Sequence, residues 1–194
     1  MNLLNGGIVP QEISVFGIIT HGKDTLVGFS PDRKLYAVPG GGLKEEDYNL
    51  EAILWRELEE EVGDIANYEL ACPTPLLFYF DRDEQRVISP KRAVFAETLK
   101  LHAYFLMGAK EKNKIRQKDK NFKKPGFKPP AFFDNKILLR PSLAYAVKKF
   151  NKKKQWPKVK DFSLKGLLPN LDAIRMDMTD MNLHPDLIES LTRA

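Results

Sequence analysis

One stretch, residues 40–63, constrains the fold of this chain more than any other. It reads GGGLKEEDYNLEAILWRELEEEVG, so three glycines after Pro39 precede a strongly acidic segment. Glycines let the backbone turn tightly and approach a ligand closely, and Asp47 or Asn49 is a candidate helix N-cap. Gly63 lies where a helix commonly ends in a left-handed residue. The helix would dock on a core through an apolar stripe at four-residue spacing, formed by Leu54, Leu58 and Val62.

The same helix carries three glutamates that share one face, because residues three and four apart are neighbours on a helix. These are Glu57, Glu60 and Glu61, and Arg56 is the single cation beside them. Like charges in this arrangement repel each other, and Arg56 alone does not neutralise three carboxylates. Hard oxygen ligands suit Mg²⁺ or Mn²⁺, so we predict a metal site here, with Arg56 orienting the glutamates. A solvated acidic face is the alternative, but such faces usually mix Lys with Glu.

The stretch resembles the signature of the Nudix hydrolase family, which is G, five residues, E, seven residues, then R-E-U-x-E-E-x-G-U with U aliphatic. The matching residues are Gly42, Arg56, Glu57, Leu58, Glu60, Glu61 and Gly63. Tyr48 stands where the signature has its first Glu, and Asp64, followed by Ile65, stands at the last aliphatic position. Glu46 or Asp47 is a candidate substitute for the missing carboxylate.

The resemblance implies an α/β/α sandwich and a Mg²⁺- or Mn²⁺-dependent pyrophosphohydrolase that cleaves a nucleoside diphosphate linked to another moiety. The residues make this sensible, since a divalent cation bridges phosphate oxygens and activates water. The backbone N–H groups of Gly40, Gly41 and Gly42, near the expected helix start, would contact the pyrophosphate. The alternative is a catalytically weak or inactive module of the same fold that binds nucleotide or RNA, because Tyr48 supplies no carboxylate.

The rest of the chain predicts a mixed sheet. Residues 13–20 and 25–29 form a hairpin around the turn at residues 21–24, and further strands are expected at residues 35–38, 76–80, 86–89 and 99–107. Residues 92–96 fit a strand or a helix. Pro141 opens a helix over residues 141–150 with apolar residues on one side, which would cover the sheet opposite the acidic helix.

Two segments hold most of the basic charge. Residues 110–128 contain nine Lys or Arg and read as a loop, and residues 148–160 add seven Lys, against a net charge of +5 for the chain. The resemblance places the first segment on the substrate side. We therefore expect a nucleotide-type substrate or an RNA 5′ end to contact Lys118, Lys120, Lys123 and Lys124. A solubilising surface is the competing interpretation. The nearby phenylalanines would either stack on a base or be buried, and these are Phe122, Phe127, Phe132 and Phe133.

The general base is the least constrained residue, because the family takes it from different places. Asp134, just before an apolar run, is our first candidate, and Glu111 and Asp119 are alternates. Glu60 or Glu61 also remains open for this role.

The domain organisation is predicted as follows. Residues 1–160 form one catalytic domain with a basic insertion at 110–130, and residues 161–194 form a helical extension packed on it. A single Cys72 fits a reducing compartment, and neither a leader nor a membrane-spanning segment is recognisable. We expect a cytoplasmic protein without a membrane partner. Its oligomeric state is left open.

Overall fold

The structure is a computed structural model, and it describes residues 10, 12–44, 47, 49–89 and 98–153. Its strands are β1 (Glu12–His21), β2 (Asp24–Ser30), β3 (Leu35–Ala37), β4 (Gly40–Gly42), β5 (Tyr68–Asp81), β6 (Arg86–Ile88), β7 (Leu99–Ala109) and β8 (Lys123–Lys128). Its helices are α1 (Leu50–Glu61) and α3 (Pro141–Lys153), with short 3-10 turns η1 (Ile65–Asn67), η2 (Pro130–Asp134) and η3 (Lys136–Leu138).

The strands form one mixed sheet with the order β3-β2-β1-β7-β5-β6. The central pair, β1 and β7, is parallel, and the other pairs are antiparallel. β4 pairs with β1, and β8 pairs with β2, both outside the main strand order. The predicted hairpin of β1 and β2 is confirmed, with Thr20 opposite Thr25. The sheet is therefore mixed, as predicted.

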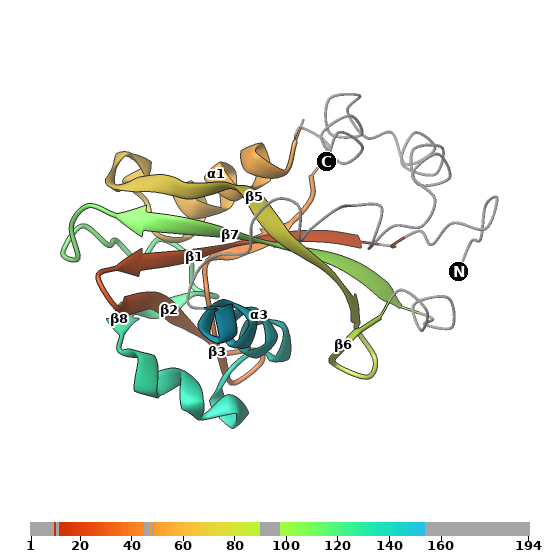
Figure 1. Ribbon diagram of the computed structural model, residues 1–194. Helices are drawn as coiled ribbons and strands as arrows, with labels where there is room; N and C mark the ends of the chain where they lie inside the picture. The colour runs from red at the N-terminus through yellow and green to blue at the C-terminus, as the bar shows by residue number, and fades with distance from the viewer. Residues whose placement is uncertain (1–9, 11, 45–46, 48, 90–97, 154–194) are drawn as a thin grey trace.

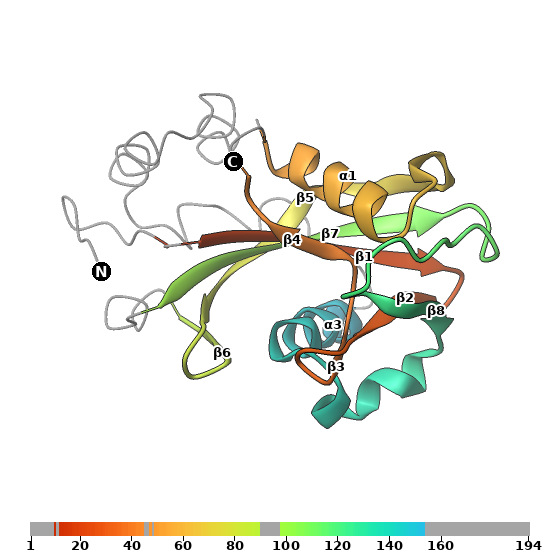
Figure 2. The same cartoon turned by 180° about the vertical axis from the view of Figure 1, so that it is seen from behind.

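The two helices cover opposite faces of the sheet (Figures 1 and 2). Alternate residues of β1 serve the two layers. Ile13, Val15 and Ile19 join the core under α1, whereas Phe16 and Ile18 join the core under α3. The predicted α/β/α arrangement is thus confirmed for the described residues, because each face of the sheet is sealed by one helix.

Two elements differ from the prediction. β5 begins at Tyr68, well before the predicted start at residue 76, and its pairing with β7 shifts register between Leu70 and Leu76. Pro73 and Pro75 lie in that interval. Because proline has no N–H to donate to a neighbouring strand and is rare inside strands, the sequence pattern did not predict this part of β5. The loop predicted for residues 110–128 is wrong at its end, since residues 123–128 form β8 along β2.

Several predictions lie outside the described residues. These are the helical extension at 161–194, the segment at 92–96, Tyr48 and Glu46, and the end of the second basic run. In the part of the chain that is described, no helix is both long and apolar enough to cross a membrane.

Candidate functional site

The acidic helix α1 has the boundaries that its sequence predicts. Asn49 is the N-cap, and its Oδ1 accepts a hydrogen bond of 2.7 Å from the N–H of Ala52. At the other end Gly63 has a φ of 60°, and its N–H donates to the carbonyl of Leu58 at 3.0 Å. The predicted apolar stripe is fully buried in the core. These contacts fix the position of Glu57 and Glu61, which lie beside the buried stripe in the last two turns.

The three glycines do not form the predicted turn but the short strand β4. Gly40, Gly41 and Gly42 pair with Phe16, Val15 and Ser14 of β1. Gly40 has a φ of 143°, and an added Cβ would lie 2.1 Å from the carbonyl oxygen of Val15. The glycines were predicted to let the backbone approach a ligand, whereas the close approach of Gly40 in the structure is to the protein's own backbone.

β4 lies against the C-terminal half of α1, not against its start. The N–H of Gly40 donates to Oε2 of Glu61 at 2.8 Å, so it is not free for a pyrophosphate as predicted. A Cβ on Gly41 would lie 2.5 Å from the carboxylate of Glu57. Two of the three predicted metal ligands, Glu57 and Glu61, therefore pack against β4. The strand leaves room for these carboxylates because its residues are glycines without a Cβ.

Arg56 holds this arrangement together through several hydrogen bonds. Its guanidinium makes two with Asp47, at 3.0 and 2.8 Å, one with Glu57 at 2.6 Å and one with the carbonyl of Gly42 at 2.8 Å. The predicted contact of Arg56 with the glutamates is thus present, with a longer one to Glu60 at 3.4 Å. The hydrogen bond to Asp47 is the main cause that raises the pKa of Arg56.

Asp47 has a role that the sequence did not reveal. It was a candidate cap or substitute metal ligand, but it is buried and both of its oxygens face Arg56. It also accepts from the N–H of Lys44 at 2.8 Å, which closes the loop before α1. The only sequence signal for this role is the presence of an acid in the loop nine residues before Arg56.

Glu60 separates from the other two glutamates. Its carboxylate accepts from Nζ of Lys44 at 2.8 Å, and its side chain is 45% exposed. This ion pair lowers the pKa of Glu60. Among the described residues, no three His, Cys, Asp or Glu side chains stand ready as a metal cluster. The structure brings Glu57 and Glu61 together and leaves Glu60 outside.

The site nevertheless carries a surplus of negative charge. Two cations, Arg56 and Lys44, contact Asp47, Glu57 and Glu60, while the partner of the Glu61 carboxylate among the described residues is the N–H of Gly40. The formal surplus of these six side chains is two negative charges, not counting Arg33 and Arg140 in the wall of the adjoining cavity. Burial raises the pKa of Glu61 to about 8. The hydrogen bond from the Gly40 N–H acts to lower this pKa, and the charge of Glu57 raises it further. Burial likewise raises the pKa of Glu57, opposed by Arg56. A divalent cation fits this charge and these oxygen donors.

The basic segment is anchored beside α1. The N–H of Arg116 donates to the carbonyl of Val62, and the N–H of Lys118 donates to that of Glu61, both at 3.1 Å. Phe122 is buried in the core and lies against Gly28. Of the two alternatives predicted for this residue, burial therefore holds and base stacking does not. The lysines predicted to bind substrate are exposed, and these are Lys118, Lys120, Lys123 and Lys124.

The anchored segment brings Asp119 toward the site. Its charge helps to raise the pKa of Glu61, after the effects of burial and Glu57. Its Oδ1 accepts from the N–H of Asn121 at 2.8 Å, which fixes the carboxylate. Asp134, our first candidate for the general base, is instead exposed at the end of η2, and Glu111 is exposed beside Asn67. Of the three candidates, Asp119 is the one that follows the backbone contact between Lys118 and Glu61.

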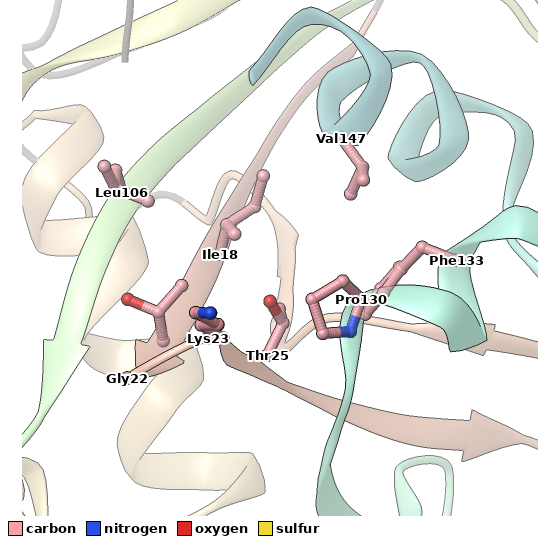
Figure 3. Close-up of a pocket in the computed structure, with 9 residues that line it drawn as sticks. Ile18, Gly22, Lys23, Thr25, Leu106, Pro130, Phe133 and Val147 are labelled. Carbon is pink, nitrogen blue, oxygen red and sulfur yellow. The ribbon is translucent and has the colours of Figure 1, made fainter. Parts of the chain in front are cut away.

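Two cavities flank the sheet. One, of about 250 Å³, adjoins Glu61 and is lined by charged residues and by Gly40, Asn121 and Phe122. The other, of about 290 Å³, lies under α3 and is lined mainly by apolar side chains such as Ile18, Leu106 and Val147 (Figure 3). Of these two cavities, the first touches a predicted metal ligand, Glu61, and the second touches Phe133, one of the candidate base-stacking residues.

Comparison with known proteins places this arrangement in a fold. No family model matches the sequence, and no curated protein does. Many solved structures are similar, among them the following three. A NUDIX hydrolase from Nitrosomonas europaea has a TM-score of 0.57 at 12% identity, over 79% of this chain and 96% of its own. The dihydroneopterin triphosphate pyrophosphohydrolase of E. coli has a TM-score of 0.52 at 16% identity, over 74% and 97%.

The third is a bifunctional NMN adenylyltransferase/ADP ribose pyrophosphatase from Francisella tularensis, complexed with AMP and a Mn ion. Its TM-score is 0.52 at 18% identity, over 75% of this chain and 42% of its own. These likenesses agree with the mixed sheet and the α/β architecture described above. The chain therefore has the fold of the Nudix hydrolases.

Proposed function

We propose that the protein is a divalent-metal-dependent pyrophosphohydrolase that cleaves a nucleoside diphosphate linked to another moiety. The observation that carries this proposal is the surplus negative charge at Glu57 and Glu61, which are held against the glycine strand β4 beside an open cavity. Buried carboxylates are unfavourable unless a cation compensates them. A structure devoted to stability alone would more simply place apolar residues there.

Glu57 and Glu61 are the residues that would hold Mg²⁺ or Mn²⁺. When bound, such an ion neutralises charge on phosphate oxygens and makes water a better nucleophile. Arg56 keeps the Glu57 carboxylate in one orientation, and the N–H of Gly40 does the same for Glu61. This rigidity limits the reorganisation needed during the reaction.

Asp119 is the proposed general base. As water attacks one phosphorus of the anhydride, the bond from that phosphorus to the bridging oxygen breaks, and a proton passes from the water to a carboxylate oxygen of Asp119. The hydrogen bond from the N–H of Asn121 keeps this carboxylate in place. Its position beside Glu61, through the backbone bond of Lys118, supports the assignment.

The named activities of similar structures support the same substrate class. One neighbour is called a triphosphate pyrophosphohydrolase, and another is an ADP ribose pyrophosphatase complexed with AMP and a Mn ion. The first name describes cleavage of dihydroneopterin triphosphate, and the second describes a pyrophosphatase of ADP ribose bound to a nucleotide, so both concern compounds with consecutive phosphates. We extend that substrate class, but not a particular substrate, to this chain.

One observation favours a second candidate, a module that binds nucleotide or RNA without turnover. Glu57 and Glu60 are already engaged by Arg56 and Lys44, and the described residues hold no ready cluster of three metal ligands. The exposed lysines of the basic segment would then provide most of the binding energy. Turnover distinguishes the two candidates.

The experiment is a substrate panel with Mg²⁺ or Mn²⁺, covering nucleotide sugars, ADP-ribose, dinucleoside polyphosphates, nucleoside triphosphates and 5′-triphosphate RNA. We expect hydrolysis of at least one, and a fall of about 100-fold or more in Glu61→Gln. Glu59→Gln is the matched control, because Glu59 is exposed on the same helix, and it should keep wild-type rates. Inactivity toward the whole panel, or a fully active Glu61→Gln, would contradict the proposal.

A further inference from the structure

The cavity beside Glu61 contains two arginines that the catalytic proposal does not use. Arg33 and Arg140 both line it, together with Glu61, Gly40 and Asp32. Within the described residues, neither guanidinium makes a hydrogen bond or an ion pair with a protein group. Two unpaired cations therefore face the same space as the carboxylate of the proposed metal site.

β3 positions both arginines. Arg33 lies in the turn between β2 and β3, which the Ser30 and Leu35 pair closes. The N–H of Arg140 donates to the carbonyl of Tyr36 at 3.0 Å, in the middle of β3. From β3 the chain continues directly to Gly40, whose N–H holds Glu61. One short segment thus sets the spacing between the arginines and the carboxylate.

Arg140 is built into this wall rather than free in solvent. Its guanidinium lies 4.7 Å from the ring centroid of Phe16, and its carbonyl accepts from the N–H of Ala144 in α3 at 3.0 Å. Burial lowers the pKa of Arg140 to about 10, with Arg33 adding to the fall and Tyr104 and Glu61 opposing it. A partly buried cation without a partner acid is unfavourable on its own, and a bound anion would relieve it.

We propose that Arg33 and Arg140 form an anion subsite that binds the second phosphate of the substrate, next to the phosphate that reacts at Glu57 and Glu61. The assignment rests on the proposed function, because it places one phosphate at each end of the cavity. Guanidinium groups match phosphate oxygens in a two-pronged geometry that lysines do not offer. The substrate class is accordingly a small compound with at least two consecutive phosphates.

The basic segment has a different position. The cavity is lined by Asn121 and Phe122 from that segment, but by none of its lysines. Its lysines would therefore act on whatever extends beyond the cavity, while the arginines select the diphosphate itself. This division makes the arginines, not the lysines, the residues that determine whether a pyrophosphate binds.

The test is calorimetric binding of methylenediphosphonate, a diphosphate analogue that resists hydrolysis, to the full chain in Mg²⁺. We expect Arg33→Gln and Arg140→Gln to weaken binding at least tenfold, and Arg140→Lys to give an intermediate loss because it keeps the charge without the fork. Arg86→Gln makes the same change of charge on β6, where Arg86 pairs with Glu84 outside the cavity, and should bind within twofold of wild type.

Several results would overturn the subsite. The first is that the wild-type protein does not bind the analogue. The second is that both Arg33→Gln and Arg140→Lys bind it as tightly as wild type. The third is that Arg86→Gln weakens binding as much as the Arg33 and Arg140 variants do. Arg33 is exposed on a turn, so its variant tests the idea even where Arg140→Gln fails to fold. If the wild-type protein hydrolyses a substrate of the panel but the arginine variants bind the analogue as tightly as wild type, the subsite is wrong and the hydrolase proposal stands. If the wild-type protein binds the analogue and the arginine variants do not, but no substrate of the panel is hydrolysed, the hydrolase proposal is wrong and the subsite stands.

Discussion

The two faces of the sheet bury polar groups in different ways. On the α1 face, Glu57 and Asp47 are buried as carboxylates and share Arg56. On the α3 face, the buried polar side chains His102, Tyr104 and Ser142 carry no formal charge in their ordinary state. The hydroxyls of Tyr104 and Ser142 bond each other at 2.8 Å. The buried carboxylates of this comparison therefore lie on the α1 face, whereas the charge at the α3 face is the cation Arg140, whose guanidinium packs on Phe16.

The cavities repeat the contrast. The cavity beside Glu61 has Arg33, Arg140 and Asp32 in its wall, whereas the cavity under α3 has one charged residue, Lys23, among apolar side chains (Figure 3). A pocket with converging polar groups is the better candidate for a binding site. Mutations around the cavity beside Glu61 should therefore affect turnover, and mutations of apolar residues in the core under α3 should affect stability.

The largest effect is expected from Gly40→Ala on the α1 face. The added Cβ would collide with the carbonyl of Val15, and the φ of 143° is unfavourable for alanine. β4 would shift, and Glu61 would lose its N–H partner, so turnover should fall about 100-fold or more with a loss of roughly 1–3 kcal/mol in stability. Gly126→Ala is the control, because nothing lies within 4 Å of its Cβ position. Equal rates for both variants would break the contrast.

The next effect is expected from Leu143→Ala on the α3 face. Leu143 is fully buried in the core under α3. Its truncation should lower the free energy of unfolding by about 2–5 kcal/mol, measured by urea denaturation, while kcat of the folded protein stays at the wild-type value. Ile137→Ala, at a residue that is 85% exposed, should change neither. A large fall in kcat with an intact fold would show that this face also serves the chemistry.

A smaller effect concerns His102 and pH. Burial lowers the pKa of His102 well below its ordinary 6.5, helped by the charges of Arg140, Lys100 and Arg33. Below about pH 6.5 the His102 side chain is protonated in the unfolded chain but not in the folded protein. The free energy of unfolding therefore decreases as the pH is lowered, by at most about 1.4 kcal/mol per pH unit. Above that range the contribution is constant.

His102→Phe should flatten this acid slope. Neither ring nitrogen has a hydrogen-bond partner among the described residues, and Phe80 stacks on the ring at 4.7 Å, so phenylalanine suits the site. Ile137→Ala, at an exposed position, removes no titratable group and is the control that should leave the slope as it is. The measurement is the free energy of unfolding between pH 5 and pH 8, and an unchanged slope in His102→Phe would refute the explanation.

The smallest effect on small substrates is expected from the basic segment. Replacing Lys118, Lys120, Lys123 and Lys124 with Gln removes exposed charges that do not line the cavity. Turnover of a small nucleotide should change less than about threefold, whereas the salt dependence of binding to a 5′-triphosphate RNA should become shallower. An unchanged salt slope would identify the segment as a solvated surface.

The parts of the molecule that could be predicted are those specified by neighbouring residues. The helix α1, its Asn49 cap, its end at Gly63 and its buried stripe all follow from local spacing. The hairpin of β1 and β2 and the helix at Pro141 were found for the same reason. Local chemistry was sufficient there because it agreed with the final packing.

The missed parts depend on contacts between distant segments. Three glycines carry no strand signal, and β4 exists because β1 offers an edge and α1 brings Glu61 to Gly40. Residues 123–128 became β8 for a similar reason, despite Pro125 and Gly126. Arg140 and Asp47 also gained their positions through β3 and Arg56, which no spacing along the chain indicates.

The same argument explains the division among the glutamates. Helical spacing correctly put Glu57, Glu60 and Glu61 on neighbouring positions of one helix. The position of Lys44, set by the loop before α1, then draws Glu60 outward. The number of metal ligands on a helix face is thus decided by the surrounding loop as well as by the helix.

The most direct measurement for the central claim is Mn²⁺ binding, followed by electron paramagnetic resonance in the absence of substrate. If Glu57 and Glu61 hold the cation, Glu57→Gln and Glu61→Gln should each weaken Mn²⁺ binding at least tenfold. Glu60→Gln should weaken it less, because Glu60 is paired with Lys44, and Glu59→Gln should not weaken it at all. Equal losses in Glu59→Gln and Glu61→Gln, or wild-type affinity in both Glu57→Gln and Glu61→Gln, would contradict the account.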